Sequence, residues 1–167
     1  MNASPQDEPG SFARPTAPTL VALTLQRPWA WAISHSSKRV ENRTWTPPSH
    51  LVGSYLAIHA GKTWDEDGAD TVAILTRCMP VEPSEHPLGI VAVARLARVI
   101  DCARDDVPED QERWACGPYA WLLEDVVALP ELVTAAGHQG LWPVTGEALL
   151  KVREGYRRGR RNAGRVA

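Results

Sequence analysis

Cysteine, phenylalanine and long apolar runs are scarce in this chain of 167 residues. The three cysteines form no CxxC pair and are odd in number, which argues against a disulfide framework and against a zinc site. No apolar run approaches the length of a membrane span, and the first residues lack the apolar core of a signal peptide. We therefore expect a cytoplasmic protein that contacts no membrane and holds no metal or cofactor.

Charge is distributed unevenly, although the formal net charge is only -2. Residues 151–167 contain seven Lys or Arg and one Glu, which gives 7 - 1 = +6, so residues 1–150 carry -8. A basic segment on an acidic body is a common way to contact polyanions. The same segment can be the solvated end of a helix, and the sequence leaves both interpretations open.

The order of apolar, polar and turn-forming residues predicts one domain with two tails. Residues 1–18 have the composition of a disordered leader, residues 19–158 form the domain, and residues 159–167 form a basic disordered tail. Strands are predicted at 19–25, 39–45, 54–60, 88–100, 119–129 and 140–142. Helices are predicted at 28–36, at 63–77 behind a Thr63-x-x-Glu66 capping box, and at 145–158. These elements predict an α+β fold, a mixed β-barrel flanked by two to three helices.

The densest group of polar residues lies between residues 26 and 62. Lys38 and Arg43 can supply charge to a phosphate, and so can the free N–H groups of a helix that starts at Pro28. The count of seven tryptophans against one phenylalanine also favours a nucleotide ligand, since an indole such as that of Trp29 stacks well on a base. In the alternative interpretation, which the residues alone favour, Glu41 merely pairs with its basic neighbours and the tryptophans are core.

Three consecutive blocks carry a family resemblance: residues 23–30 (LTLQRPWA), 38–45 (KRVENRTW) and 56–62 (LAIHAGK). Shorter blocks follow at 89–93 (GIVAV), 121–126 (WLLEDV) and 140–142 (GLW). In this order and spacing they resemble the ASCH domain family of the PUA-like superfamily. The resemblance implies a PUA-like mixed β-barrel with a cleft between the barrel and its first helix, and a role in contacting RNA or DNA.

Carried over residue by residue, the family's motif lysine, glutamate and arginine fall on Lys38, Glu41 and Arg43. Ser36 stands where family members often have glycine. The resemblance and the chemistry together predict a monomer that binds RNA or single-stranded nucleic acid. The expected binding residues are Gln26, Arg27, Pro28, Trp29, Lys38, Glu41, Arg43, Trp45, His59 and Lys62.

An enzymatic alternative stays open. Some relatives of similar fold are hydrolases that cut RNA or cleave an acyl group from a modified cytidine. In the amidohydrolase-like relatives a threonine takes the position of Glu41, so that nucleophile is missing here, and nothing in the sequence shows the hydroxyl of Thr24 or Thr44 to be activated. If the chain is an enzyme, Lys38, Glu41 and His59 are its candidate catalytic residues. A third possibility is a protein-interaction module that uses the basic C-terminal segment.

Overall fold

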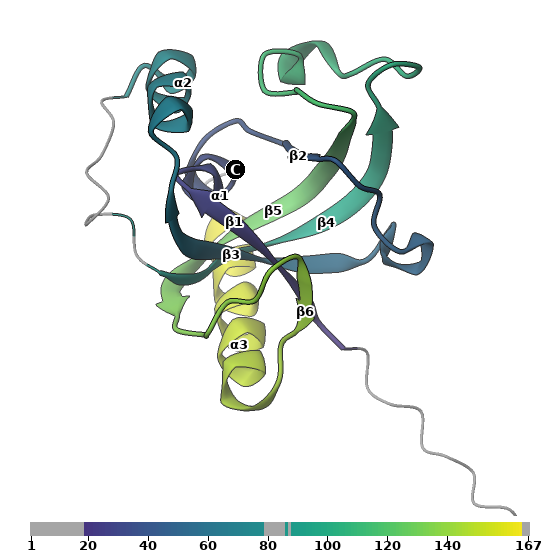
Figure 1. The fold of residues 1–167 in the computed structure, drawn as a ribbon. Helices are drawn as coiled ribbons and strands as arrows, with labels where there is room; N and C mark the ends of the chain where they lie inside the picture. Colours follow the sequence, from purple (N-terminus) through teal and green to yellow (C-terminus); the bar gives the residue numbers. More distant parts are fainter. Residues whose placement is uncertain (1–18, 79–85, 87, 165–167) are drawn as a thin grey trace, which may run out of the picture.

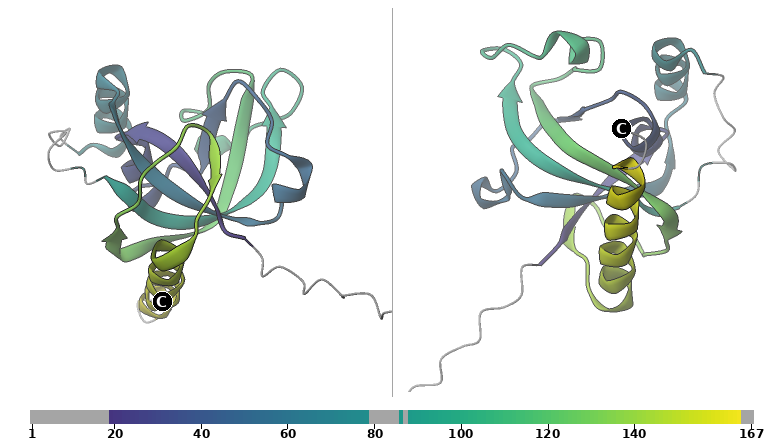
Figure 2. Two further views of the ribbon diagram at one scale, coloured as in Figure 1. Left: turned by 60° about the horizontal axis from the view of Figure 1, so that its bottom comes forward. Right: turned by 180° about the vertical axis from the view of Figure 1, so that it is seen from behind.

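The computed structural model describes residues 19–78, 86 and 88–164. Its centre is a six-stranded sheet in the order β2-β5-β4-β3-β1-β6, which curls strongly on itself (Figures 1 and 2). The elements are β1 (Val21–Arg27), α1 (Trp29–His35), β2 (Val40–Arg43), β3 (Tyr55–Trp64), α2 (Glu66–Thr76), β4 (Gly89–Asp101), β5 (Tyr119–Val133), β6 (Leu141–Pro143) and α3 (Gly146–Ala163), with 3₁₀ turns at Ser49–Leu51 and Glu109–Gln111.

The pairing of the strands is mixed. β1 and β3 run parallel, whereas each of the other neighbouring pairs is antiparallel. The interior of the curl is filled by aliphatic side chains from several strands and by Trp121, which is completely buried. The curled mixed sheet and its helices confirm the α+β class and the barrel-like architecture expected from the sequence.

The crossover from β1 to α1 brings polar residues to one end of the sheet. Pro28 precedes the first turn of α1, which suits a residue without an N–H. Ala30, Ala32 and Ile33 bury the inner face of this helix against the sheet, and the helix ends at Ser36. α1 and α2 lie together toward one end of the curled sheet, while α3 packs on β5 toward the other (Figure 1).

The start of α2 differs from the predicted capping box. β3 continues to Trp64, which pairs with Arg27 of β1, so Thr63 lies in the strand instead of capping a helix. Asp65 is the N-cap, and its carboxylate accepts a hydrogen bond of 2.9 Å from the backbone N–H of Gly68. The prediction of a Thr63–Glu66 capping box was therefore wrong, because strand pairing extends past the position at which the pattern suggested a helix start.

The C-terminal helix is longer than the sequence suggested. α3 continues to Ala163, so residues 159–163 are helical instead of forming part of a disordered tail. Gly159 explains the extension, because it lies so close to β5 that a Cβ there would stand 2.7 Å from the carbonyl oxygen of Ala128. The leader 1–18 and residues 165–167 lie outside the described residues. None of the helices described has the length and apolar character needed to cross a membrane.

Candidate functional site

Two adjoining cavities open where β1, β2 and β3 meet α1. The triad cavity, of about 320 Å³, is named for Lys38, Glu41 and Arg43, which line it together with Trp29. The loop cavity, of about 750 Å³, lies between β1, β3 and the loop 134–140, and His59 and Lys62 line it. Thr24, Gln26 and Arg43 line both cavities, which therefore share a wall.

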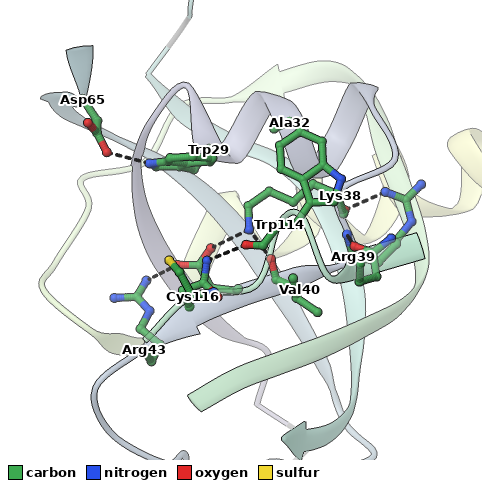
Figure 3. Close-up of polar contacts among 12 residues, drawn as sticks. Trp29, Ala32, Lys38, Arg39, Val40, Arg43, Asp65, Trp114 and Cys116 are labelled. Atoms are coloured by element: carbon green, nitrogen blue, oxygen red, sulfur yellow. Dashed lines mark hydrogen bonds and ion pairs between the residues drawn. The ribbon is translucent and has the colours of Figure 1, made fainter. Parts of the chain in front are cut away.

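The triad itself is built by a turn and a strand. Glu41 and Arg43 alternate along β2 and so project to the same face, while Lys38 comes from the turn that follows α1. One carboxylate oxygen of Glu41 lies 3.1 Å from Arg43 Nη2, and the other lies 3.9 Å from Lys38 Nζ. Glu41 is therefore within ion-pair distance of both basic side chains, Lys38 and Arg43, which Figure 3 labels.

Burial sets the electrostatics of the triad. The side chain of Lys38 is 1% exposed, and its ammonium lies 5.4 Å from the ring centre of Trp29 and 6.0 Å from that of Trp114. Burial lowers the pKa of Lys38, an effect that the carboxylate of Glu41 opposes. Burial likewise raises the pKa of Glu41, and the nearby Lys38 and Arg43 counteract it. With all three groups ionised, the triad carries one net positive charge.

Neighbouring contacts hold these groups in position. Lys38 Nζ donates a hydrogen bond to the carbonyl of Val40, and Arg43 Nη2 donates one of 2.9 Å to the carbonyl of Thr24 (Figure 3 shows the first). The indole N–H of Trp29 donates to the Asp65 carboxylate at 2.8 Å, so the N-cap of α2 also fixes the aromatic wall. Arg43 therefore ties β2 to β1, and its guanidinium has little freedom to move.

The structure divides the ten predicted binding residues. Gln26, Trp29, Lys38, Glu41, Arg43, His59 and Lys62 line one or both cavities. Within the described part of the chain, the remaining three line neither cavity. The guanidinium of Arg27 donates to the carbonyls of His86 and Lys62, at 2.8 and 2.7 Å. Pro28 is buried at the start of α1, and Trp45 packs edge-on against Trp121 with ring centres 4.8 Å apart.

The expected contribution of a helix N-terminus is small. α1 has seven residues, so it has only about two turns of aligned peptide dipoles to attract a phosphate. Positive charge at the site comes instead from side chains. Gln26 is exposed on the wall that the two cavities share, which leaves its amide accessible to a ligand.

Sequence reasoning missed several residues of the site. The amide of Asn42 bonds the backbone of Trp114 and Cys116, at 2.8 and 2.9 Å, and so holds that loop beside the triad cavity. Asp65 and Cys116 also line the triad cavity. The spacing of Asp65 before Gly68 and the helix behind it could have revealed the N-cap, but no local pattern links Cys116 to residue 42.

A second polar network crosses the loop cavity. Thr24 Oγ1 lies 3.3 Å from His59 Nδ1, and His59 Nε2 lies 3.2 Å from the carbonyl oxygen of Ala135. Trp142 donates its indole N–H to the same Thr24 oxygen at 2.9 Å. Because a carbonyl can only accept, Nε2 carries a ring proton; in the neutral ring Nδ1 then accepts the hydroxyl proton of Thr24. Burial lowers the pKa of His59, which favours this neutral form.

The fold and the site together define a class, a curled mixed-sheet α+β protein with a charged cleft beside its first helix. No family model matches the chain, and no curated protein matches it. Among solved structures, the ASCH protein of Zymomonas mobilis shares 16% identity at a TM-score of 0.44, with 80% of this chain and 93% of that chain covered. A point mutant of the Zymomonas mobilis protein shares 15% identity at the same TM-score, covering 80% and 96%.

Both solved structures bear the name of the family that the sequence blocks resemble. At this identity and TM-score, nothing about a ligand or a residue's role transfers from them to this chain.

Proposed function

We propose that the chain binds single-stranded nucleic acid, RNA above all, across the triad and loop cavities. One observation carries the proposal: Lys38, Glu41 and Arg43 line one cavity, and Lys38 and Glu41 are almost fully buried there. Taking a charged group out of water costs roughly several kcal/mol per ion. Because the attraction within a buried ion pair barely repays this cost, such a pair adds little to the stability of a fold. Such groups in a cleft are therefore candidates for ligand binding.

Each part of the cleft has a role in this proposal. Arg43, on the shared wall, and Lys62, exposed at the loop cavity, contact phosphate groups. Trp29 offers part of its ring as a wall for a base, and the exposed amide of Gln26 bonds a base edge or a ribose hydroxyl. Glu41 lies deeper and acts by fixing the position of Arg43, whereas the buried Lys38 adds positive charge to the cleft.

Binding to a short fluorescent RNA and to DNA of matching sequence, followed by anisotropy at low salt, tests this proposal. We expect Arg43→Ala and Lys38→Ala each to weaken RNA binding by about tenfold or more, since each removes a cation from the cleft. Arg104→Ala is the matched control, because its side chain is 83% exposed and lies outside both cavities. If both cleft variants bind as tightly as the parent protein, the cleft assignment is wrong.

The basic face of α3 supplies the competing surface. Arg157 and Arg161 are exposed on this helix, and the sequence left open whether the segment contacts polyanions. Replacing both by glutamate reverses its charge without touching the buried Val152 or Gly159. A loss of RNA binding in this variant, with none in Arg43→Ala, would move the binding surface to α3. Light scattering of the same samples tests the monomeric state expected from the sequence.

A further inference from the structure

We propose that Thr24 and His59 form a nucleophile–base pair that hydrolyses carboxylic esters at the wall between the two cavities. This inference goes beyond nucleic-acid binding and does not depend on it. It starts from the hydrogen bond between Thr24 Oγ1 and His59 Nδ1, at 3.3 Å. Thr24 and His59 both line the loop cavity, so the pair borders a space that can hold a ligand.

One lone pair of the Thr24 hydroxyl oxygen is available for nucleophilic attack. Its hydroxyl donates its proton to His59 Nδ1 and accepts one hydrogen bond from the indole of Trp142, at 2.9 Å. A hydroxyl oxygen has two lone pairs, so one remains for a carbonyl carbon. The side chain is half-buried, which limits hydration of the oxygen without sealing it off.

A third group orients the base, as nucleophile–base pairs require. The carbonyl of Ala135 accepts from His59 Nε2 at 3.2 Å and so leaves Nδ1 free of its proton and directed at Thr24. Gly137 fixes the ring from the side, because a Cβ at that position would stand 2.2 Å from His59 Cε1. In its neutral form His59 is thus oriented and in contact with the hydroxyl, which is the arrangement in which a histidine acts as a base.

The chemical step balances without a metal or a redox partner. Thr24 Oγ1 bonds to the ester carbonyl carbon while its proton moves to His59 Nδ1. The carbon–oxygen bond to the alcohol then breaks, and the alcohol leaves with that proton. Water next attacks the acyl group on Thr24; His59 accepts the water's proton and returns it to Thr24 as the acid departs. Positive charge on Arg43, along the same wall, favours the oxyanion that forms in both steps.

Esters fit this site better than amides do. An alkoxide leaving group takes a proton readily from an imidazolium, whereas expulsion of an amine demands much stronger stabilisation of the tetrahedral intermediate. Trp142 and Arg43 are the donors that the described residues place beside Thr24, by an indole bond at 2.9 Å and a guanidinium bond to the Thr24 carbonyl at 2.9 Å. With such modest support, the more reactive acyl group is the substrate class that the geometry indicates.

The test uses two probes on the full chain: p-nitrophenyl acetate for turnover and a fluorophosphonate for covalent labelling, with the labelled peptide mapped by mass spectrometry. We expect the label on Thr24, and a labelling rate that falls about 100-fold in Thr24→Val and in His59→Gln. Thr145→Val and His50→Gln are the matched controls, because both positions are exposed and lie away from these cavities. The parent's rate should rise with pH through a midpoint below 6.5, since neutral His59 is the base and burial lowers its pKa.

Folding is controlled separately, because Thr24→Val also removes the acceptor for Trp142. Circular dichroism and thermal melts of each variant identify any that do not fold, and Thr24→Ser, which keeps the hydroxyl, should still be labelled. Mapping the label on the parent protein needs no variant at all. No labelling of the parent, or a label on any residue other than Thr24, overturns the proposal. RNA binding by folded Thr24→Val shows whether the cleft functions separately from this chemistry.

Discussion

The two ends of β1 face cavities of opposite character. At the Thr24–Arg27 end the strand borders the triad and loop cavities, whose walls contain buried or half-buried charged groups. Near Val21 it borders a third cavity, of about 580 Å³ beneath α3, with a largely apolar wall that includes Leu20, Val152 and Tyr156. A helix laid across a sheet readily leaves a hollow of the second kind, whereas the first kind requires charge to be kept out of water at a cost in stability. That cost supports the proposal that ligands bind at the polar end.

The largest expected effect lies in the triad. Glu41→Gln removes the negative charge between Lys38 and Arg43 and leaves a buried ammonium without its counter-ion, so we expect the free energy of unfolding to fall by about 3–5 kcal/mol. Urea denaturation followed by tryptophan fluorescence measures the loss. The double variant Lys38→Met, Glu41→Gln should recover most of it, because no unpaired charge then remains on the lysine side. An additive double variant would show that the two groups do not interact.

A matched change at the apolar end should lower the free energy of unfolding by less and leave RNA binding intact. Val152 is 1% exposed beside the third cavity, and Val152→Ala removes two methyl groups from that wall. We expect the free energy of unfolding to fall by about 2 kcal/mol, from lost burial and an enlarged cavity. Affinity for the RNA oligonucleotide should match that of the parent protein. A comparable loss of affinity in Val152→Ala and Arg43→Ala would erase the contrast between the two ends.

A conservative change separates the charge of Arg43 from the geometry of its guanidinium. Lysine keeps the positive charge, but its flexible stem lacks the rigid, planar guanidinium that holds Nη2 of Arg43 against both the carbonyl of Thr24 and the carboxylate of Glu41. We expect Arg43→Lys to weaken RNA binding about tenfold, or about 1.4 kcal/mol, by anisotropy. Parent-like affinity would mean that charge alone matters at this position and that the guanidinium geometry does not.

The smallest expected effect is a pH dependence at His59. Its pKa is lowered in the folded state, chiefly by burial, so between that pKa and 6.5 the unfolded chain binds more protons than the folded chain. Stability should therefore fall as pH drops from 7 to 5, and protonation of His59 on unfolding contributes to that fall. His59→Gln should remove that part of the decline in urea titrations at the two pH values. A variant with an unchanged pH dependence would contradict the assignment.

The elements that depend on residues close together in the sequence were predicted well. The strand at the start of the chain, the helix after Pro28 and the alternation that places Glu41 and Arg43 on one face all appear in the structure. Element boundaries were less predictable, because β3 is prolonged by pairing with β1 and α3 by the contact of Gly159 with β5. Both extensions depend on partners distant in sequence.

The site was predictable in composition but only partly in the roles of its residues. The cluster from Gln26 to Lys62 does line the cavities, whereas Arg27 is taken up by two backbone carbonyls. The hydrogen-bonded position of Thr24 could not be foreseen, since it depends on His59 and on Trp142, which is 118 residues away along the chain. Such a network exists only once three strands are side by side.

Because Thr24, Gln26 and Arg43 line both cavities, ligands bound in the two cavities would contact the same side chains. A ligand in the triad cavity that draws on Arg43 changes the surface that a ligand in the loop cavity meets, and the reverse holds equally. Linkage requires the two effects on affinity to be identical in size, whatever their sign. A nucleotide bound on one side of the wall would thus act as an effector for whatever binds on the other, without any movement of the sheet.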